Sequence, residues 1–115
     1  MRTLNDYFLT GTIDDVSTAF TLRIACPDSG RVIKIITVLG GAISGADAGI
    51  SAKINGTAMT GGTITVAYSG SAAGDVDTCE PTGANNVEQD GYIEIVTDGA
   101  STGAHSLHYT IIIRR

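Results

Sequence analysis

The chain has 115 residues, and its hydrophobic share of 43% is large enough for a folded core and excludes general disorder. Twelve acidic and seven basic residues give a formal net charge of −5, and the basic residues are scattered, so we expect no nucleic-acid binding. The sequence holds no apolar run long enough for a transmembrane helix and does not start with a secretory signal, so we expect neither membrane insertion nor signal-directed export. The fifteen glycines favour short strands joined by tight turns.

The first third of the chain predicts three strands. Residues 7–13 and 16–26 are rich in β-branched and aromatic side chains and are separated by a pair of aspartates. The turn at residues 27–30 reads Pro-Asp-Ser-Gly, in which proline fixes φ and glycine accepts an unusual backbone angle. Residues 31–39 are almost continuously apolar, which predicts a central strand buried on much of both faces.

The clearest local signal is a hairpin in the middle of the chain. The dipeptide Asn55-Gly56 separates the β-branched segments 50–54 and 57–60, and this dipeptide favours the positive φ angles of a type I′ turn. The pair Gly61-Gly62 predicts a second turn into a strand over residues 63–68. The sequence therefore predicts a three-stranded meander here.

The rest of the chain also favours strands. Residues 40–49 form a predicted flexible connection with a single helical turn around 46–48, and residues 75–80 a short edge strand. Residues 91–97 and 106–114 complete about eight strands. With no significant amphipathic helix, the fold expected is an all-β antiparallel sandwich of jelly-roll type.

No motif in the sequence satisfies the requirements of a catalytic site, and we expect the protein not to be an enzyme. Residues 99–103 match the hydrolase pattern Gly-x-Ser-x-Gly, but a strand rather than a helix is predicted after them, and no acidic residue follows Ser101. The residues Asp75, Asp77 and Glu80 resemble the start of a calcium loop without its glycine and distal glutamate. We favour a solvated loop over a weak cation site, and predict no cofactor.

Two histidines and two cysteines are the remaining candidates for chemistry. His105 and His108 are three residues apart, which places them on opposite faces of a strand, so we predict no metal site. A histidine at a subunit contact would make assembly sensitive to acid. Cys26 and Cys79 are expected to be small half-buried side chains, and a disulfide between them is the alternative.

Several phrases of the sequence resemble the small capsid decoration (cement) proteins of tailed bacteriophages. The resemblance covers roughly residues 16–115 and lies in the turn sequences and the composition of the strands rather than in a catalytic signature. The phrases are AISGADA (42–48), INGTA (54–58), GGTITV (61–66), GSAAGDVD (70–77) and IVTDGASTG (95–103).

The resemblance implies a structural protein of the virion. Such proteins are jelly-roll sandwiches, usually trimers, that sit on the outer capsid surface, bridge major capsid proteins and stabilise the head. They are made in the host cytoplasm. The implied partners are the major capsid protein and other copies of the chain.

The segment before residue 16 lies outside the resemblance. We divide the chain into residues 1–10, an N-terminal arm or a lead-in to the first strand, and residues 11–115, a single sandwich domain. Apolar bulk gathers in the arm, which makes the following residues candidates for a capsid or subunit contact: Leu4, Tyr7, Phe8 and Leu9. The alternative is a first strand that packs on its own sandwich.

Two other functions are compatible with this fold. One is a head-fibre or tail component of the same virion. The other is a carbohydrate-binding adhesion module, which the 5% aromatic share and the absence of tryptophan disfavour.

Overall fold

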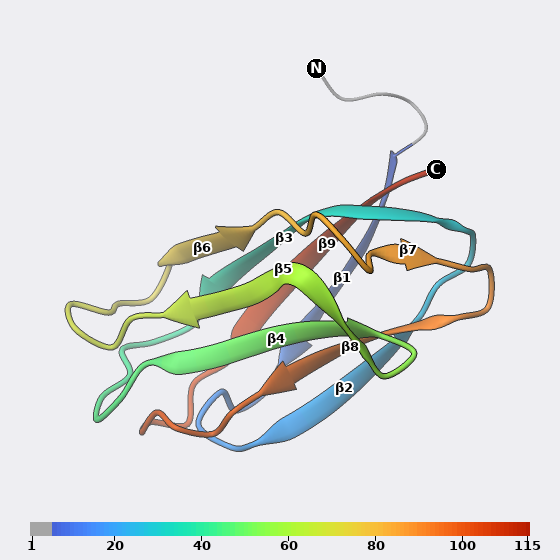
Figure 1. The fold of residues 1–115 in the computed structure, drawn as a ribbon. Coiled ribbons are helices and arrows are strands. Elements are labelled where there is room, and N and C mark those ends of the chain that lie inside the picture. The colour runs from blue at the N-terminus through green and yellow to red at the C-terminus, as the bar shows by residue number, and fades with distance from the viewer. Residues whose placement is uncertain (1–5) are drawn as a thin grey trace.

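The structure is a computed structural model, and it describes residues 6–115. The described residues form nine strands and no helix, which confirms the all-β prediction (Figure 1). The strands are β1 (Asp6–Ile13), β2 (Phe20–Ala25), β3 (Gly30–Leu39), β4 (Ala48–Ile54), β5 (Thr57–Val66), β6 (Val76–Cys79), β7 (Asn86–Val87), β8 (Tyr92–Thr97) and β9 (Leu107–Arg114).

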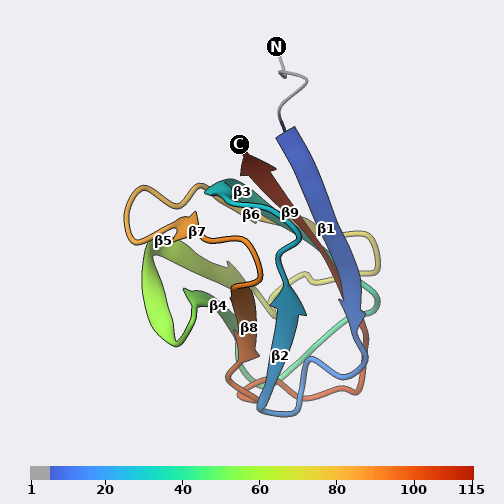
Figure 2. The same cartoon turned by 90° about the vertical axis from the view of Figure 1, so that its right-hand side faces the viewer.

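The strands form two antiparallel sheets with the topology of a jelly roll. Sheet A has the order β1-β9-β3-β6, and β7 also pairs with β3; sheet B has the order β2-β8-β4-β5. Most connections cross from one sheet to the other, so that sequence neighbours rarely pair, as in two interleaved Greek keys. Figure 2 shows the sheets face to face, with the edge strands β1 and β2 along one side.

The core between the sheets is aliphatic. Alternate residues of each strand point inward, so Leu107, Tyr109, Ile111 and Ile113 of β9 are buried together. β3 does not bury both faces as predicted. Its inward residues are fully buried, whereas its outward residues at positions 34, 36 and 38 are only half-buried, because no strand or loop of residues 6–115 forms a layer over the outside of sheet A.

The Asn55-Gly56 hairpin is present, with φ angles of 48° and 87° at the two residues. The second turn predicted at Gly61-Gly62 is wrong, because β5 continues through both glycines to Val66. The register with β4 shifts between Ser51 and Lys53, so the glycines lie in a bulge, where Gly61 takes a φ of 75°. The predicted meander is therefore a single bent hairpin.

Two further local predictions are wrong. The second strand begins at Phe20 and not at residue 16, because residues 14–19 form a loop in which the Asp15 carboxylate accepts hydrogen bonds from Ser17 and Thr18. The helical turn around residues 46–48 is absent. Ala48 already belongs to β4, and Ser44 forms a β-bridge with Thr102.

Candidate binding surface

The predicted contact residues on β1 divide between the two faces of that strand. Tyr7 and Leu9 point inward and pack against the core, whereas Phe8 points outward and is 43% exposed. The Tyr7 hydroxyl donates a hydrogen bond of 2.6 Å to the carbonyl of Asp28, and burial raises its pKa. Leu4 lies outside the described residues. A contact of these residues with another protein stays a prediction.

The outward side of sheet A carries mainly threonine and aliphatic side chains over three rows of paired residues. Directly paired residues of β1, β9, β3 and β6 stand in rows across the sheet. One row reads Thr10, Thr110, Ile36 and Thr78, and each is uncharged. We call this surface the A face and define it by these outward residues: Phe8, Thr10, Thr12, Lys34, Ile36, Val38, Val76, Thr78, His108, Thr110 and Ile112.

Among the residues that define the A face, only Lys34 carries a formal charge. Val76 is 59% exposed at one corner, and Ile112 near the opposite corner is buried because Phe8 and Lys34 flank it in the ladder. Large exposed apolar surfaces on soluble proteins commonly mark sites of contact with other macromolecules. The alternation of threonine and aliphatic residues was visible in the sequence, but the surface requires the strand register, which the sequence does not supply.

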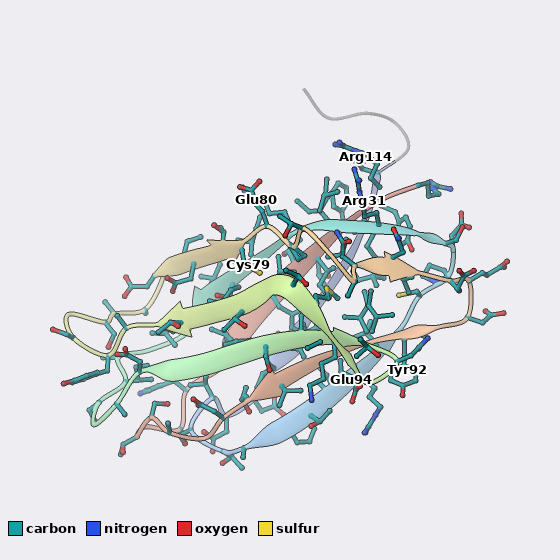
Figure 3. The ribbon with its side chains drawn as sticks, viewed as in Figure 1. Arg31, Cys79, Glu80, Tyr92, Glu94 and Arg114 are labelled. Carbon is teal, nitrogen blue, oxygen red and sulfur yellow. The ribbon has the colours of Figure 1, made fainter. Side chains whose placement is uncertain are left out.

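The outward side of sheet B is different in character. Glu94 is buried there and pairs across the sheet with Arg23 on one side and Lys53 on the other. The Arg23 Nε to Glu94 Oε2 distance is 3.5 Å. Figure 3 labels Glu94 and Tyr92 on this sheet. Charged groups are costly to remove from water, so this side of the sandwich is less suited to docking than the A face.

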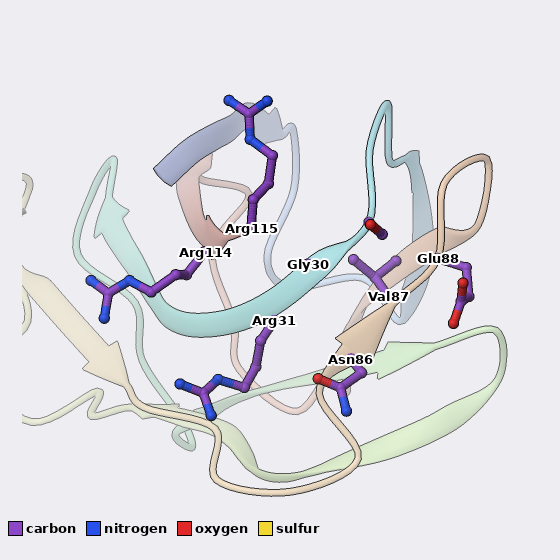
Figure 4. Close-up of a pocket in the computed structure, with 8 residues that line it drawn as sticks. Gly30, Arg31, Asn86, Val87, Glu88, Arg114 and Arg115 are labelled. Atoms are coloured by element: carbon purple, nitrogen blue, oxygen red, sulfur yellow. The ribbon is translucent and has the colours of Figure 1, made fainter. Parts of the chain in front are cut away.

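A basic row closes one end of sheet A. Arg114 binds the Asp6 carboxylate through two hydrogen bonds of 2.9 and 3.2 Å, and this carboxylate raises the pKa of the guanidinium. Arg31 is paired directly opposite Arg114 in the ladder. A shallow groove of about 580 Å³ lies beside them, lined also by Asn86 and Arg115 (Figure 4). The groove contains no acid–base or nucleophile pair.

The opposite end of the sandwich is acidic. Each loop there contains at least one aspartate and no lysine or arginine: residues 14–19, 40–47, 67–75 and 98–106. The carboxylates of Asp15, Asp47, Asp75 and Asp98 each accept a backbone N–H at 2.9–3.1 Å. These aspartates hold the loops in shape, and the loops close the end of the core.

The structure separates the residues that the sequence brought forward for chemistry. His108 is exposed on the A face, whereas His105 lies in the loop before β9. Asp75 and Asp77 lie near each other, and burial followed by the charge of Asp75 raises the pKa of Asp77. Within residues 6–115, no three His, Cys, Asp or Glu side chains lie close enough together to hold a metal ion.

The serine of the Gly-x-Ser-x-Gly pattern is not an accessible nucleophile. Ser101 is buried in the loop between β8 and β9, and its hydroxyl has no hydrogen-bond partner in the described part of the chain. Cys26 and Cys79 are free thiols, and burial raises the pKa of both. Raised thiol pKa values are the reverse of what a reactive cysteine requires.

Comparison with known proteins finds a similar fold but no matching family. No protein-family model matches the chain, and no curated protein matches its sequence. In the solved acidic stable capsid structure of Helicobacter pylori bacteriophage KHP30, one chain has a similar fold, with a TM-score of 0.63 and 10% sequence identity. The match covers 96% of this chain and 87% of that one. The jelly-roll fold of this protein is therefore shared, over nearly its whole length, with a chain of a phage capsid structure.

Proposed function

We propose that this protein is a structural component of a tailed-phage virion that binds the outer surface of the capsid. It bridges neighbouring major capsid proteins and stabilises the head, and it acts as a trimer. The observation that carries the proposal is the A face, a broad sheet surface of threonine and aliphatic residues with one formal charge. The fold shared with a chain of a phage capsid structure supports the same role.

The A face suits docking on a protein shell for a physical reason. Removing charged groups from water is costly, and an uncharged threonine and aliphatic surface avoids most of that cost. The face stands on four paired strands, so little conformational entropy is lost when it binds. On a lattice, many weak identical contacts add up through avidity.

Of the predicted contact residues that the structure describes, Phe8 is the one that faces outward on the A face. It is paired with Ile112, and together they form an apolar corner near the start of β1 and the end of β9. Tyr7 and Leu9 support this corner from beneath by fixing β1 on the core. We assign the capsid contact to Phe8 and its neighbours on the A face.

Co-sedimentation with capsid shells tests the proposal. The chain is co-expressed with the major capsid protein of the same genome, and shells are pelleted and assayed for bound chain. The double variant Ile36→Lys/Val76→Lys places two charges on the A face, and we expect at least ~10-fold weaker binding, or about 1.4 kcal/mol. The matched control Ser51→Lys/Thr63→Lys places two charges on the outward side of sheet B and should bind normally.

Equal binding by both double variants would show that the A face is not the docking surface. Absence of the unaltered chain from shells would contradict capsid binding itself. Binding to isolated tails in place of heads would favour a tail component.

A further inference from the structure

A notch opens between the two edge strands of the sandwich. β1 is the edge of sheet A and β2 is the edge of sheet B, and they run along the same side of the molecule (Figure 2). The notch has a volume of about 310 Å³, enough for one or two side chains. Phe20 in its wall is 52% exposed, an unusual position for a phenylalanine. The lining residues are Thr12, Asp14, Asp15, Thr18, Phe20 and Leu22.

The walls of the notch are held in place by hydrogen bonds from buried and loop residues. The buried hydroxyl of Thr97 donates to the carbonyl of Thr18 at 2.7 Å and accepts from the Phe20 N–H at 3.0 Å. Asp15 accepts from the Ser17 N–H at 2.9 Å and from the Thr18 hydroxyl at 3.0 Å. The exposed Phe20 therefore stands at the start of β2, where hydrogen bonds to Thr97 hold the strand and the preceding loop in place.

The chemistry of the notch defines its occupant. Phe20 and Leu22 supply an apolar wall, and Asp14 and Asp15 supply two carboxylates at its rim. A matching occupant combines an apolar side chain with a cation a short distance away in an extended segment. Residues 1–5 read Met-Arg-Thr-Leu-Asn, in which Leu4 and Arg2 are two residues apart and so project to the same side when the segment is extended.

Leu4 is too close along the chain to the start of β1 to reach the notch of its own copy. Leu4 is two residues from Asp6, so its Cα lies at most ~7 Å from that of Asp6. Asp6 begins β1, and Thr12, the nearest lining residue on that strand, is six residues further along, or ~20 Å at the usual strand rise. A Leu4 side chain in the notch would therefore belong to another copy of the chain.

We infer that residues 1–5 of a neighbouring copy occupy this notch, with Leu4 against Phe20 and Leu22 and with Arg2 beside Asp14. Among the described strands β1 and β2 are edge strands of their sheets, so strand addition by the incoming segment would reinforce the contact. The contact joins two different patches, and such contacts close into rings or continue as filaments. The inference rests on the self-association in the proposed function and names the surfaces that form it.

Charge exchange tests the contact on the full chain without any capsid. Arg2→Glu and Asp14→Arg are each expected to weaken self-association at least ~10-fold, as measured by sedimentation equilibrium. The double variant Arg2→Glu/Asp14→Arg should associate again, because every altered arm in a ring of identical copies then meets a complementary notch. Glu80→Arg is the control, since it changes the net charge as much as Asp14→Arg at an exposed residue outside the notch. A failure of the double variant to recover, or a monomeric unaltered chain, would overturn the inference.

Disulfide trapping gives a second and direct readout. The variant Leu4→Cys/Thr18→Cys should form covalent dimers and higher species on mild oxidation, seen on a non-reducing gel. Leu4→Cys/Thr63→Cys, with the second thiol on the outward side of sheet B, should not, and the single Leu4→Cys variant reports any reaction with the native thiols. A disulfide within one chain would refute the reach argument. Because no shell is present, failure of either experiment leaves capsid binding by the A face untouched.

Discussion

The ring of Tyr109 lies across the backbone of Gly11, its directly paired neighbour in the ladder between β9 and β1. A Cβ atom built on Gly11 would lie 2.7 Å from Cζ of the tyrosine ring. Aromatic rings commonly cover a glycine on a neighbouring strand in this way. The glycine lets the edge strand approach the ring closely, and the ring in turn closes the core beneath β1.

Gly11→Ala should therefore destabilise the fold. The added methyl group displaces the buried ring or pushes β1 away from β9, and overpacking of this kind costs about 1–3 kcal/mol. Chemical denaturation measures the change in the free energy of unfolding. The double variant Gly11→Ala/Tyr109→Phe, which removes the hydroxyl oxygen closest to the new methyl group, should recover part of the loss; no recovery would place the strain elsewhere.

Asn85 is the buried amide that fixes the chain before β7. Its Nδ2 donates hydrogen bonds of 2.7 Å to the carbonyl of Val32 and 3.2 Å to that of Pro81. Asn85→Asp replaces the donor with a buried carboxylate that faces two carbonyl oxygens, and we expect a loss of about 2–4 kcal/mol at pH 7. The neighbouring Asn86→Asp, at an exposed position, is the control. Similar unfolding midpoints for both variants would contradict this account.

The hydroxyl of Thr97 joins β8 to the loop and strand that form the notch. Thr97→Val keeps the shape of the side chain but leaves the Phe20 N–H and the Thr18 carbonyl without this partner, so the free energy of unfolding should fall by about 1–3 kcal/mol. Thr97→Ser retains the hydroxyl and should cost less. Hydrogen exchange at the Phe20 amide should accelerate in the valine variant only, and equal rates in both would argue against the role of the hydroxyl.

Acid should weaken the loop at residues 14–19. The hydrogen bonds that Ser17 and Thr18 donate to Asp15 lower the pKa of its carboxyl. A carboxyl whose pKa is lowered by folding stabilises the fold above its unfolded pKa of about 3.9, and the contribution is lost as the pH falls through the folded value. Asp15→Asn should show a smaller loss of melting temperature between about pH 6 and 2.5 than the unaltered chain. Parallel curves for the two proteins would contradict the prediction.

The two thiols should react slowly. Burial raises the pKa of Cys26 and Cys79, so the thiolate fraction at pH 7.5 is below that of an exposed cysteine with a pKa of about 8.5. Alkylation by iodoacetamide, followed by mass spectrometry, should be slow for the folded protein and fast in guanidinium chloride. Rapid labelling of the folded chain at either thiol would show that the site opens in solution.

Local signals in the sequence predicted the strands well and their bends poorly. Asn55-Gly56 specifies a hairpin because both residues accept positive φ, and the structure agrees. Gly61 also adopts positive φ, but in a bulge, because β4 continues alongside it and keeps β5 paired beyond the glycines. A glycine with positive φ can form either a turn or a bulge, depending on how far the partner strand extends. The extent of the partner strand cannot be seen in a short stretch of sequence.

The surfaces could not be found from the sequence alone because they depend on non-local pairing. The threonines at positions 10 and 110 become neighbours only when the first and last strands pair. The notch likewise joins Thr12 to Phe20 across the gap between two sheets. The sequence did place Phe8 at a candidate contact, and the structure adds that it points outward whereas Tyr7 and Leu9 point inward.

The pairing of β1 with β9 has a mechanical consequence. Asp6 and Arg114 face each other, so the chain enters and leaves the sandwich at the same end of one antiparallel ladder. A force that pulls these ends apart would break the ladder one residue pair at a time, like a zipper, whereas a force across the sheet would load many hydrogen bonds at once. Cargo fused to either end would thus pull on the ladder one residue pair at a time, while a load carried through the A face would be shared among the paired strands of sheet A.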